Sequence, residues 1–130
     1  MSTQRFWREI PRRYRLEASR CRKCRKDYLP SRKVCPECES TEFDVVRMPD
    51  RGTVVAHTVI HVAPPQWRML VPYVVAIVEL ENGTRITTQV VDCEPEDVKI
   101  GQKVKLEFRR LTEDGASGTI VYGHKAVPID

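Results

Sequence analysis

Four of the five cysteines stand in two pairs, and their spacing constrains the fold more than any other feature of the sequence. Cys21 and Cys24 form one Cys-x2-Cys pair, and after ten further residues Cys35 and Cys38 form a second. Each pair can place two thiolates on one turn, and the intervening loop lets the two turns face each other. Four sulfurs can then surround one zinc ion at about 2.3 Å. The spacing therefore predicts a zinc ribbon.

A four-cysteine site of this kind has a structural role. Four thiolates close the coordination sphere and leave no position for water, so the zinc is expected to be structural and not catalytic. The spacing alone does not distinguish zinc from iron. Two alternatives, a pair of disulfides and a redox-active dithiol, fit less well. Residues 1–7 lack the apolar stretch and small-residue cleavage site of a secretory signal, so a reducing, cytoplasmic location is expected.

Size and composition limit what the chain can be. Its 130 residues and 15.0 kDa correspond to one domain, or to two very small units with a shared core. Hydrophobic residues make up 41% and charged residues 31%, with a mean hydropathy of -0.43, so the chain can bury a modest core. No apolar run approaches the roughly 18 residues of a membrane-spanning helix. A large multidomain enzyme is excluded.

Positive charge is concentrated at the front of the chain. Residues 1–35 carry twelve Lys or Arg against three acidic residues, whereas residues 36–130 carry ten against fifteen. A basic segment can meet nucleic acid, the phosphates of a nucleotide cofactor or an acidic face of a partner protein. Part of it can also offset the formal charge of -2 on four thiolates with Zn2+.

The first forty residues read as a helix followed by metal-held loops. From about residue 5 to residue 18, apolar residues recur at mixed helical spacing between charged ones, the pattern of a short amphipathic helix. Pro11 removes a backbone donor within it, so we expect a kink or two short pieces. The expected division is a helical segment over 1–19, a zinc ribbon over 20–42 and an OB-fold domain over 43–130.

After residue 42 the sequence consists of runs of β-branched residues separated by turn signals, which is typical of an all-β unit. Asn82-Gly83 is a strong two-residue hairpin turn. A short lead-in strand over 43–48 is expected, and Pro95-Glu96-Asp97 could open a helical turn. Five strands should follow the lead-in, over 53–62, 73–80, 84–91, 103–109 and 119–126. The predicted fold is mainly β, with an N-terminal helix and a rubredoxin-like zinc ribbon followed by a five-stranded OB-fold barrel.

No set of residues resembles a self-sufficient active site. The sequence has no Gly-rich phosphate loop, no Gly-x-Ser-x-Gly elbow and no obvious carboxylate pair. Cys93 lies between Asp92 and Glu94, which would raise the pKa of its thiol, so it reads as a small buried hydrophobe. The chain is therefore not expected to be an enzyme by itself.

The ordered residues resemble a known family, the acyl-CoA-associated OB-fold proteins with an N-terminal rubredoxin-like zinc ribbon, long known only as a domain of unknown function. The resemblance covers nearly the whole chain, with one departure: Arg25 and Glu39 stand where such ribbons usually have glycine. It rests on Phe6-Trp7, Arg20-Cys21-x2-Cys24, Tyr28-Leu29-Pro30-x-Arg32-x2-Cys35-Pro36-x-Cys38, Arg51-Gly52-Thr53-Val54, Pro72-Tyr73, Ile100-Gly101-x-Lys103-Val104 and Tyr122-Gly123.

The resemblance implies a non-catalytic scaffold subunit that bridges acetoacetyl-CoA thiolase and hydroxymethylglutaryl-CoA (HMG-CoA) synthase in the archaeal mevalonate pathway. It would help to form a passage for CoA or acyl-CoA, as a shared ligand and not a bound cofactor. An accessory subunit of another thiolase-like enzyme or an aldolase is an alternative. Partner contacts would come from Phe6, Trp7, Ile10 and Trp67, although each could instead pack on this protein itself. Contacts to CoA phosphates would come from Arg22, Lys23, Arg25 and Lys26.

A second class of function remains open, because OB folds and zinc ribbons also bind nucleic acid. Single-strand binding needs aromatic residues on the exposed barrel face and a basic groove. The two central strands offer only Tyr73 and Arg85, and the region after residue 35 is net acidic. Nucleic-acid binding therefore ranks second, and an enzyme acting alone third.

Overall fold

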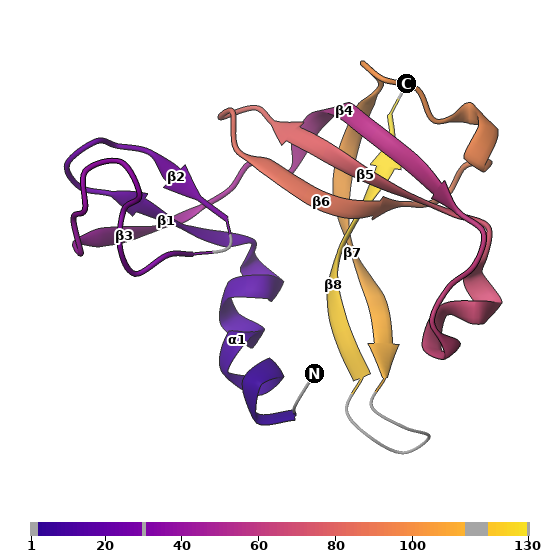
Figure 1. The fold of residues 1–130 in the computed structure, drawn as a ribbon, viewed down its shortest axis with the longest axis horizontal. Helices are drawn as coiled ribbons and strands as arrows, with labels where there is room; N and C mark the ends of the chain where they lie inside the picture. Colours follow the sequence, from indigo (N-terminus) through magenta and orange to yellow (C-terminus); the bar gives the residue numbers. More distant parts are fainter. Residues whose placement is uncertain (1–2, 30, 114–119, 130) are drawn as a thin grey trace.

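A computed structural model describes residues 3–29, 31–113 and 120–129 (Figure 1). The chain begins with one helix, continues through a small three-stranded sheet and ends in a closed five-stranded barrel. This is the architecture expected from the sequence. Thr119, the first residue of the last expected strand, lies outside the described residues. Within the described residues no helix is long and apolar enough to cross a membrane.

Helix α1 is shorter at its C-terminal end than expected. It spans Thr3–Arg15 as a single helix with Pro11 inside it, and not as two pieces. It ends because Leu16 adopts a φ of 52°, in the left-handed region that stops a helix. The next residues, predicted to be helical as far as residue 18, form strand β1 (Glu17–Cys21) instead. Pairing with a distant strand explains the difference, since a local pattern cannot reveal such pairing.

The ribbon is built on a three-stranded antiparallel sheet. Strand β1 lies in the middle, between β2 (Asp27–Tyr28) and β3 (Phe43–Arg47). The lead-in strand expected over 43–48 is thus present, and it pairs with β1, with Cys21 opposite Phe43. Because of this pairing, residues 43–47 belong to the ribbon sheet, while the division of the chain at 19 and 42 stays a prediction.

The barrel contains the five expected strands in the order β4-β5-β6-β8-β7, and it closes through pairing of β4 with β7. These strands are β4 (Arg51–Ile60), β5 (Tyr73–Leu80), β6 (Arg85–Val90), β7 (Lys103–Glu113) and β8 (Ile120–Pro128). Along β5 every second residue is buried, as the two-residue period of a strand with one face in a core requires.

Two connections in the barrel match the sequence pattern. The Asn82-Gly83 turn joins β5 to β6, with Gly83 at φ 87°, and the Leu80 N–H donates to the Thr84 carbonyl at 2.8 Å. The helical turn expected at 95–97 is a short 3-10 helix, η2 (Pro95–Asp97). The proline-rich excursion between β4 and β5 contains a second one, η1 (Pro65–Leu70), which extends away from the ribbon (Figure 1).

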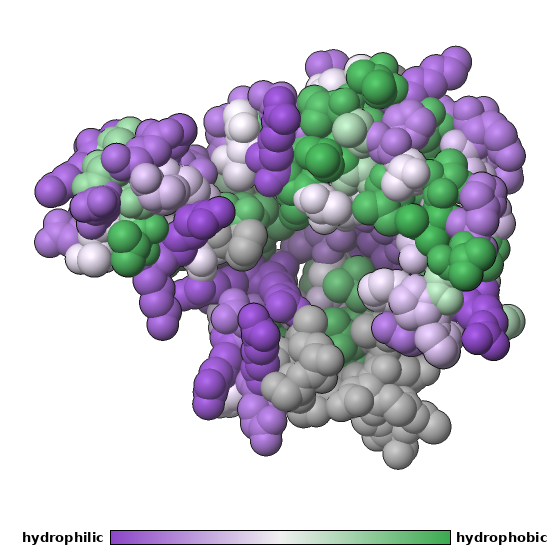
Figure 2. Space-filling view, viewed as in Figure 1, coloured by the Kyte–Doolittle hydropathy of each residue, from purple (hydrophilic) through white to green (hydrophobic). Residues whose placement is uncertain are grey.

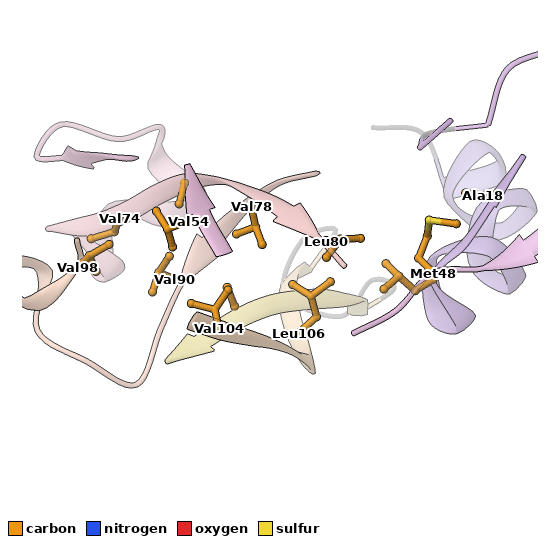
Figure 3. Close-up of a cluster of buried hydrophobic side chains, with 13 residues drawn as sticks. Ala18, Met48, Val54, Val74, Val78, Leu80, Val90, Val98, Val104 and Leu106 are labelled. Carbon is orange, nitrogen blue, oxygen red and sulfur yellow. The ribbon is translucent and has the colours of Figure 1, made fainter. Parts of the chain in front are cut away.

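One apolar cluster runs from the barrel interior to the ribbon (Figure 3). In the barrel it is made of valine, alanine and leucine side chains, several of them fully buried. At its other end the cluster includes Ala18, on β1 of the ribbon sheet, and Leu16 and Met48, which flank β1 and β3. The barrel members are Val54, Val74, Ala76, Val78, Leu80, Val90, Val98, Val104, Leu106 and Ala126. The two units therefore share one core.

Polar contacts add to this junction. The Asn82 amide, in the β5–β6 turn, donates to Asp27 Oδ2 at 2.9 Å and approaches Met48 Sδ at 3.2 Å. Asp27 also pairs with Arg20, whose Nε lies 2.7 Å from Oδ1. The side chain of Asp27 is only 7% exposed, so its charge depends on these two donors. A barrel turn is thus connected directly to the ribbon sheet.

Aromatic contacts hold α1 against the barrel. Tyr14 of the helix packs edge-on against Phe108 of β7 and Tyr122 of β8, with ring centroids 5.0 and 6.1 Å apart. Phe108 and Tyr122 stack on each other at 5.4 Å. These contacts fix the helix over the long β7–β8 hairpin and leave its other face to solvent.

Candidate metal centre

The four paired cysteines come together at the tip of the ribbon. Their sulfurs all lie within 4.8 Å of one another, and Cys21 and Cys35 are fully buried while Cys24 is exposed. The Sγ atoms of Cys21 and Cys38 are 3.4 Å apart, and those of Cys24 and Cys35 are 3.5 Å apart. A tetrahedral ZnS4 site with 2.3 Å bonds places its sulfurs roughly 3.8 Å apart. The donor set therefore fits a tetrahedral metal ion such as zinc.

Two matching turns position the sulfurs. In the first, the Arg25 N–H donates to the Cys21 carbonyl at 2.9 Å, and in the second the Glu39 N–H donates to the Cys35 carbonyl at 2.9 Å. Arg25 and Glu39 have φ values of 62° and 58°. These are the two positions where the sequence lacks the glycine typical of such ribbons. The backbone still adopts the left-handed conformation there, at a cost of about 1 kcal/mol each.

Without a bound metal, the four thiols have different pKa values, partly because they take part in different hydrogen bonds. The Tyr28 hydroxyl, 3.4 Å from Cys35 Sγ, is the main reason that the pKa of Cys35 falls to about 6. A backbone hydrogen bond lowers the pKa of Cys24, but burial and the neighbouring thiols outweigh it and raise that pKa to about 12. Four thiols this close cannot all lose their protons without a compensating cation. A divalent metal supplies that charge, so the site is arranged to bind one.

The basic residues assigned to CoA phosphates lie on the exposed surface of the same tip. Arg22 Nε pairs with Asp44 at 2.9 Å, and Lys26 pairs with Glu37. More than half of each basic side chain is exposed, so these pairs contribute little to stability. Lys23 and Arg25 are also exposed. All four side chains are thus within reach of a ligand or partner at the ribbon surface.

The residues assigned to partner contacts lie in two separate places. On α1, Trp7 is 71% exposed and Ile10 is half-buried; the side chain of Phe6 lies outside the described residues. Trp67, on η1, is half-buried because its ring packs edge-on against Tyr73 at 6.5 Å. The helix and η1 are far apart, on different sides of the molecule (Figure 1).

Sequence reasoning missed the most exposed apolar residues. Val62 is 92% exposed and Met69 is 95% exposed, at either side of Trp67 in the excursion between β4 and β5. Figure 2 shows apolar surface in this part of the barrel. The prolines that bound the segment and its single Trp were the available signal, and they drew attention to the aromatic side chain only. Val62, Trp67 and Met69 together form the excursion tip.

Within the described ranges, no other set of His, Cys, Asp or Glu residues forms a second metal centre. Among the residues that the structure describes, the four cysteines are the one cluster with metal-ligand geometry. Cys93 is half-buried, and burial, followed by the charges of Asp97 and Asp92, raises the pKa of its thiol. This agrees with its reading as a small hydrophobe and not as a nucleophile.

Comparison with known proteins gives matches along most of the chain. Residues 8–44 match the family described as "ChsH2, rubredoxin-like zinc ribbon domain", and residues 45–109 match "ChsH2, C-terminal OB-fold domain". A "DUF35 domain-containing scaffold protein" of Methanocaldococcus jannaschii is 50% identical over 97% of this chain and 90% of its own length. A protein of the same name from Methanothermobacter thermautotrophicus is 42% identical over 97% of this chain and 96% of its own.

A solved structure supports the same relationship. The chain of a structure described as "Ltp2-ChsH2(DUF35) aldolase" superposes with a TM-score of 0.75 and 33% sequence identity. The match covers 98% of this chain and 96% of that one. The similarity thus includes helix, ribbon and barrel together, and not the barrel fold alone.

Proposed function

Because the chain belongs to the DUF35 family of zinc-ribbon and OB-fold proteins, we propose that it is a non-catalytic scaffold subunit of an acyl-CoA enzyme complex. Specifically, it holds an acetoacetyl-CoA thiolase against an HMG-CoA synthase in the mevalonate pathway. The observation that carries the proposal is the 50% identity, over nearly the full length of both chains, to a protein named as a scaffold.

The geometry supports a bridging role, because a scaffold needs two separate contact surfaces. Trp7 on α1 offers one exposed aromatic side chain, and the excursion tip offers Met69 and Val62. Exposed large apolar side chains of this kind mark interaction sites, and buried aromatic residues often dominate interface energies. The two surfaces are far enough apart for each to contact a different enzyme (Figure 1). We assign one partner to each surface.

A physical advantage follows for the pathway. Condensation of two acetyl-CoA molecules is uphill, so the second enzyme must remove the product efficiently. Confinement between two enzymes raises the effective concentration of the intermediate at the second site. The basic ribbon tip, with Arg22, Lys23, Arg25 and Lys26, would contribute by meeting the phosphates of the shared CoA.

Reconstitution tests the proposal. The chain, the thiolase and the synthase of the same genome are mixed and separated by size-exclusion chromatography with light scattering. We expect a ternary complex, and no complex of thiolase with synthase when the chain is omitted. Trp7→Ala should release one enzyme and Met69→Asp the other, while the control Lys99→Ala, an exposed side chain after η2, leaves the complex intact. Failure of all three proteins to co-elute would refute the proposal.

The solved complex favours one alternative within the same class. The structure with 33% identity is described as an aldolase, so a thiolase-like aldolase is a second candidate partner. A capture experiment with the tagged chain in native lysate distinguishes the two. Recovery of an aldolase without thiolase and synthase would replace the first assignment with the second, and either result keeps the role of accessory subunit.

A further inference from the structure

The barrel is closed only narrowly between β6 and β8. These neighbouring strands run parallel and share one register pair, Val90 with Ala126, whereas β6 shares six pairs with β5 on its other side. Towards the start of β6 the two strands are linked by a side chain instead: the Thr88 hydroxyl donates to the His124 carbonyl at 3.0 Å. The region between residues 85–88 and residues 122–124 is the β6–β8 seam.

The seam exposes backbone hydrogen-bonding groups of β6. Successive residues of a strand direct their N–H and C=O groups to opposite edges. Because the Val91 N–H donates to the Ala126 carbonyl at 2.9 Å, the odd-numbered residues of β6 direct their backbone N–H and C=O groups toward β8. The N–H and C=O of Thr87 therefore point into the seam, where no backbone hydrogen bond joins them to β8 in the described part of the chain. An edge of this kind can pair with a further strand.

A cavity of about 520 Å³ lies along this edge, within the size range of ligand sites. The molecular surface is hollowed between the ribbon and the barrel (Figure 2). The walls of the cavity come from α1, from residues at the ends of β1 and β2, and from strands β6, β7 and β8. Apolar side chains that line it are Leu16, Leu29, Ile86 and Leu111. An extended chain in the cavity could bury apolar side chains while its backbone pairs with β6.

The wall opposite β6 carries an excess of positive charge. Helix α1 contributes Arg5, Arg12 and Arg13 to the lining, against Glu9 on the helix and Glu17 on β1. Glu17 is already paired with Arg15 at 3.4 Å. Arg12 donates one of its N–H groups to Ser31, so the other donors of its guanidinium can serve a ligand. Carboxylates are the groups that such a guanidinium binds in bidentate fashion.

We propose that the β6–β8 seam binds an extended acidic segment of another polypeptide. The segment adds to β6 as a strand at Thr87 and places a carboxylate against Arg12. Strand addition takes affinity from main-chain hydrogen bonds and specificity from side-chain contacts at alternate positions. A nucleic acid fits less well, because the described lining contains no Phe, Tyr or Trp on which a base could stack.

Titration of the isotope-labelled full-length zinc protein with a blocked hexapeptide of alternating valine and glutamate tests the proposal by NMR. We expect amide shifts at Thr87, Ile86 and Gly123. The same peptide with N-methyl groups on the amides of one edge should bind at least about tenfold more weakly, because it loses main-chain hydrogen bonds. A peptide with lysine in place of glutamate should also bind more weakly. Equal binding of the N-methylated peptide would exclude strand addition.

Two pairs of variants locate the site. Thr87→Pro removes the donor that faces the seam and leaves the pairing with β5 intact, as proline does at an edge, whereas the control Thr87→Val keeps the donor. Arg12→Ala removes the proposed carboxylate partner, and the control Arg8→Ala removes an exposed arginine outside the cavity. We expect weaker binding in the first variant of each pair only. Should Thr87→Pro not fold, the N-methylated peptide still decides; displacement of the peptide by inorganic phosphate or by an oligonucleotide would overturn the proposal.

Discussion

The ribbon and the barrel differ in what holds them together. Among the described residues between 17 and 47 the buried side chains are few and small, and two of them are the metal-site cysteines Cys21 and Cys35. The barrel instead surrounds a row of buried aliphatic residues, including Val54, Val78 and Val104 at 0% exposure. A unit with so small a core needs another source of stability, which a bound metal provides. One chain thus combines a metal-dependent unit with a unit that depends on hydrophobic burial.

The largest expected effect comes from removing a metal ligand. Cys35→Ser removes one of the four thiolate ligands and should abolish stoichiometric zinc binding. Because a structural zinc site contributes on the order of 10 kcal/mol to folding, the ribbon should then unfold. We expect the NMR signals of residues 17–47 to lose their dispersion while those of β4 to β8 persist. Zinc analysis and amide spectra measure both effects.

The control for that experiment is Cys93→Ser, which changes a thiol outside the cluster and should leave zinc content unchanged. Loss of dispersion along the entire chain of the Cys35→Ser protein would break the comparison. It would mean that the shared core at Leu16, Ala18 and Met48 makes the barrel depend on the ribbon.

The second effect is confined to the barrel. Leu80 is 1% exposed, and Leu80→Ala should lower the free energy of unfolding by about 3 kcal/mol through lost burial and a new cavity. Urea denaturation measures it, and zinc content should stay at one per chain. The neighbouring control is Ile77→Ala, where 37% exposure predicts a much smaller cost. Loss of zinc from the Leu80→Ala protein would contradict the separation of the two units.

The third effect is at the junction. Asn82→Ala removes the amide that donates to Asp27. The free energy of unfolding should fall by about 1 to 2 kcal/mol, because the nearly buried carboxylate keeps Arg20 as its remaining donor in the described contacts. Asn82→Asp keeps the acceptor that the Thr84 N–H uses in the turn, 3.2 Å away, but directs a second carboxylate at Asp27. If the junction carries the effect, the aspartate variant is at least as destabilised as the alanine variant; an undisturbed aspartate variant would assign the effect to the turn.

The smallest effect concerns the left-handed turns of the ribbon. Glu39→Gly should raise zinc affinity about twofold, because relief of the strain at φ 58° exceeds the added freedom of the unfolded chain by about 0.5 kcal/mol. Glu39→Ala is the matched control, since alanine keeps the strained Cβ and should bring no gain. Competition with a chromophoric chelator measures both affinities. A similar gain for alanine would show that the side chain, and not the backbone conformation, limits binding.

The sequence predicted the parts of the fold that depend on local patterns. The Cys-x2-Cys pairs predicted the metal centre, and Asn82-Gly83 predicted the β5–β6 hairpin, because turn geometry admits few residue types. The amphipathic pattern predicts helix as far as residue 18, because the start of β1 has no pattern of its own that differs from the helix before it. Its conformation depends on pairing with β3, more than twenty residues away. The exposure of Met69 and Val62 was equally hidden, since an apolar residue in a sequence does not reveal whether anything covers it.

The sequence by itself determined the four metal ligands, the order of helix, ribbon and barrel, and the family. These follow from spacing and from residue types, which are properties of short segments. The tertiary structure alone decided that Asn82 meets Asp27, that α1 lies over the β7–β8 hairpin, and that β6 shares only one register pair with β8 among the described residues, beside a basic wall. Each of these joins residues far apart in the chain, and only the packing of the shared core brings them into contact.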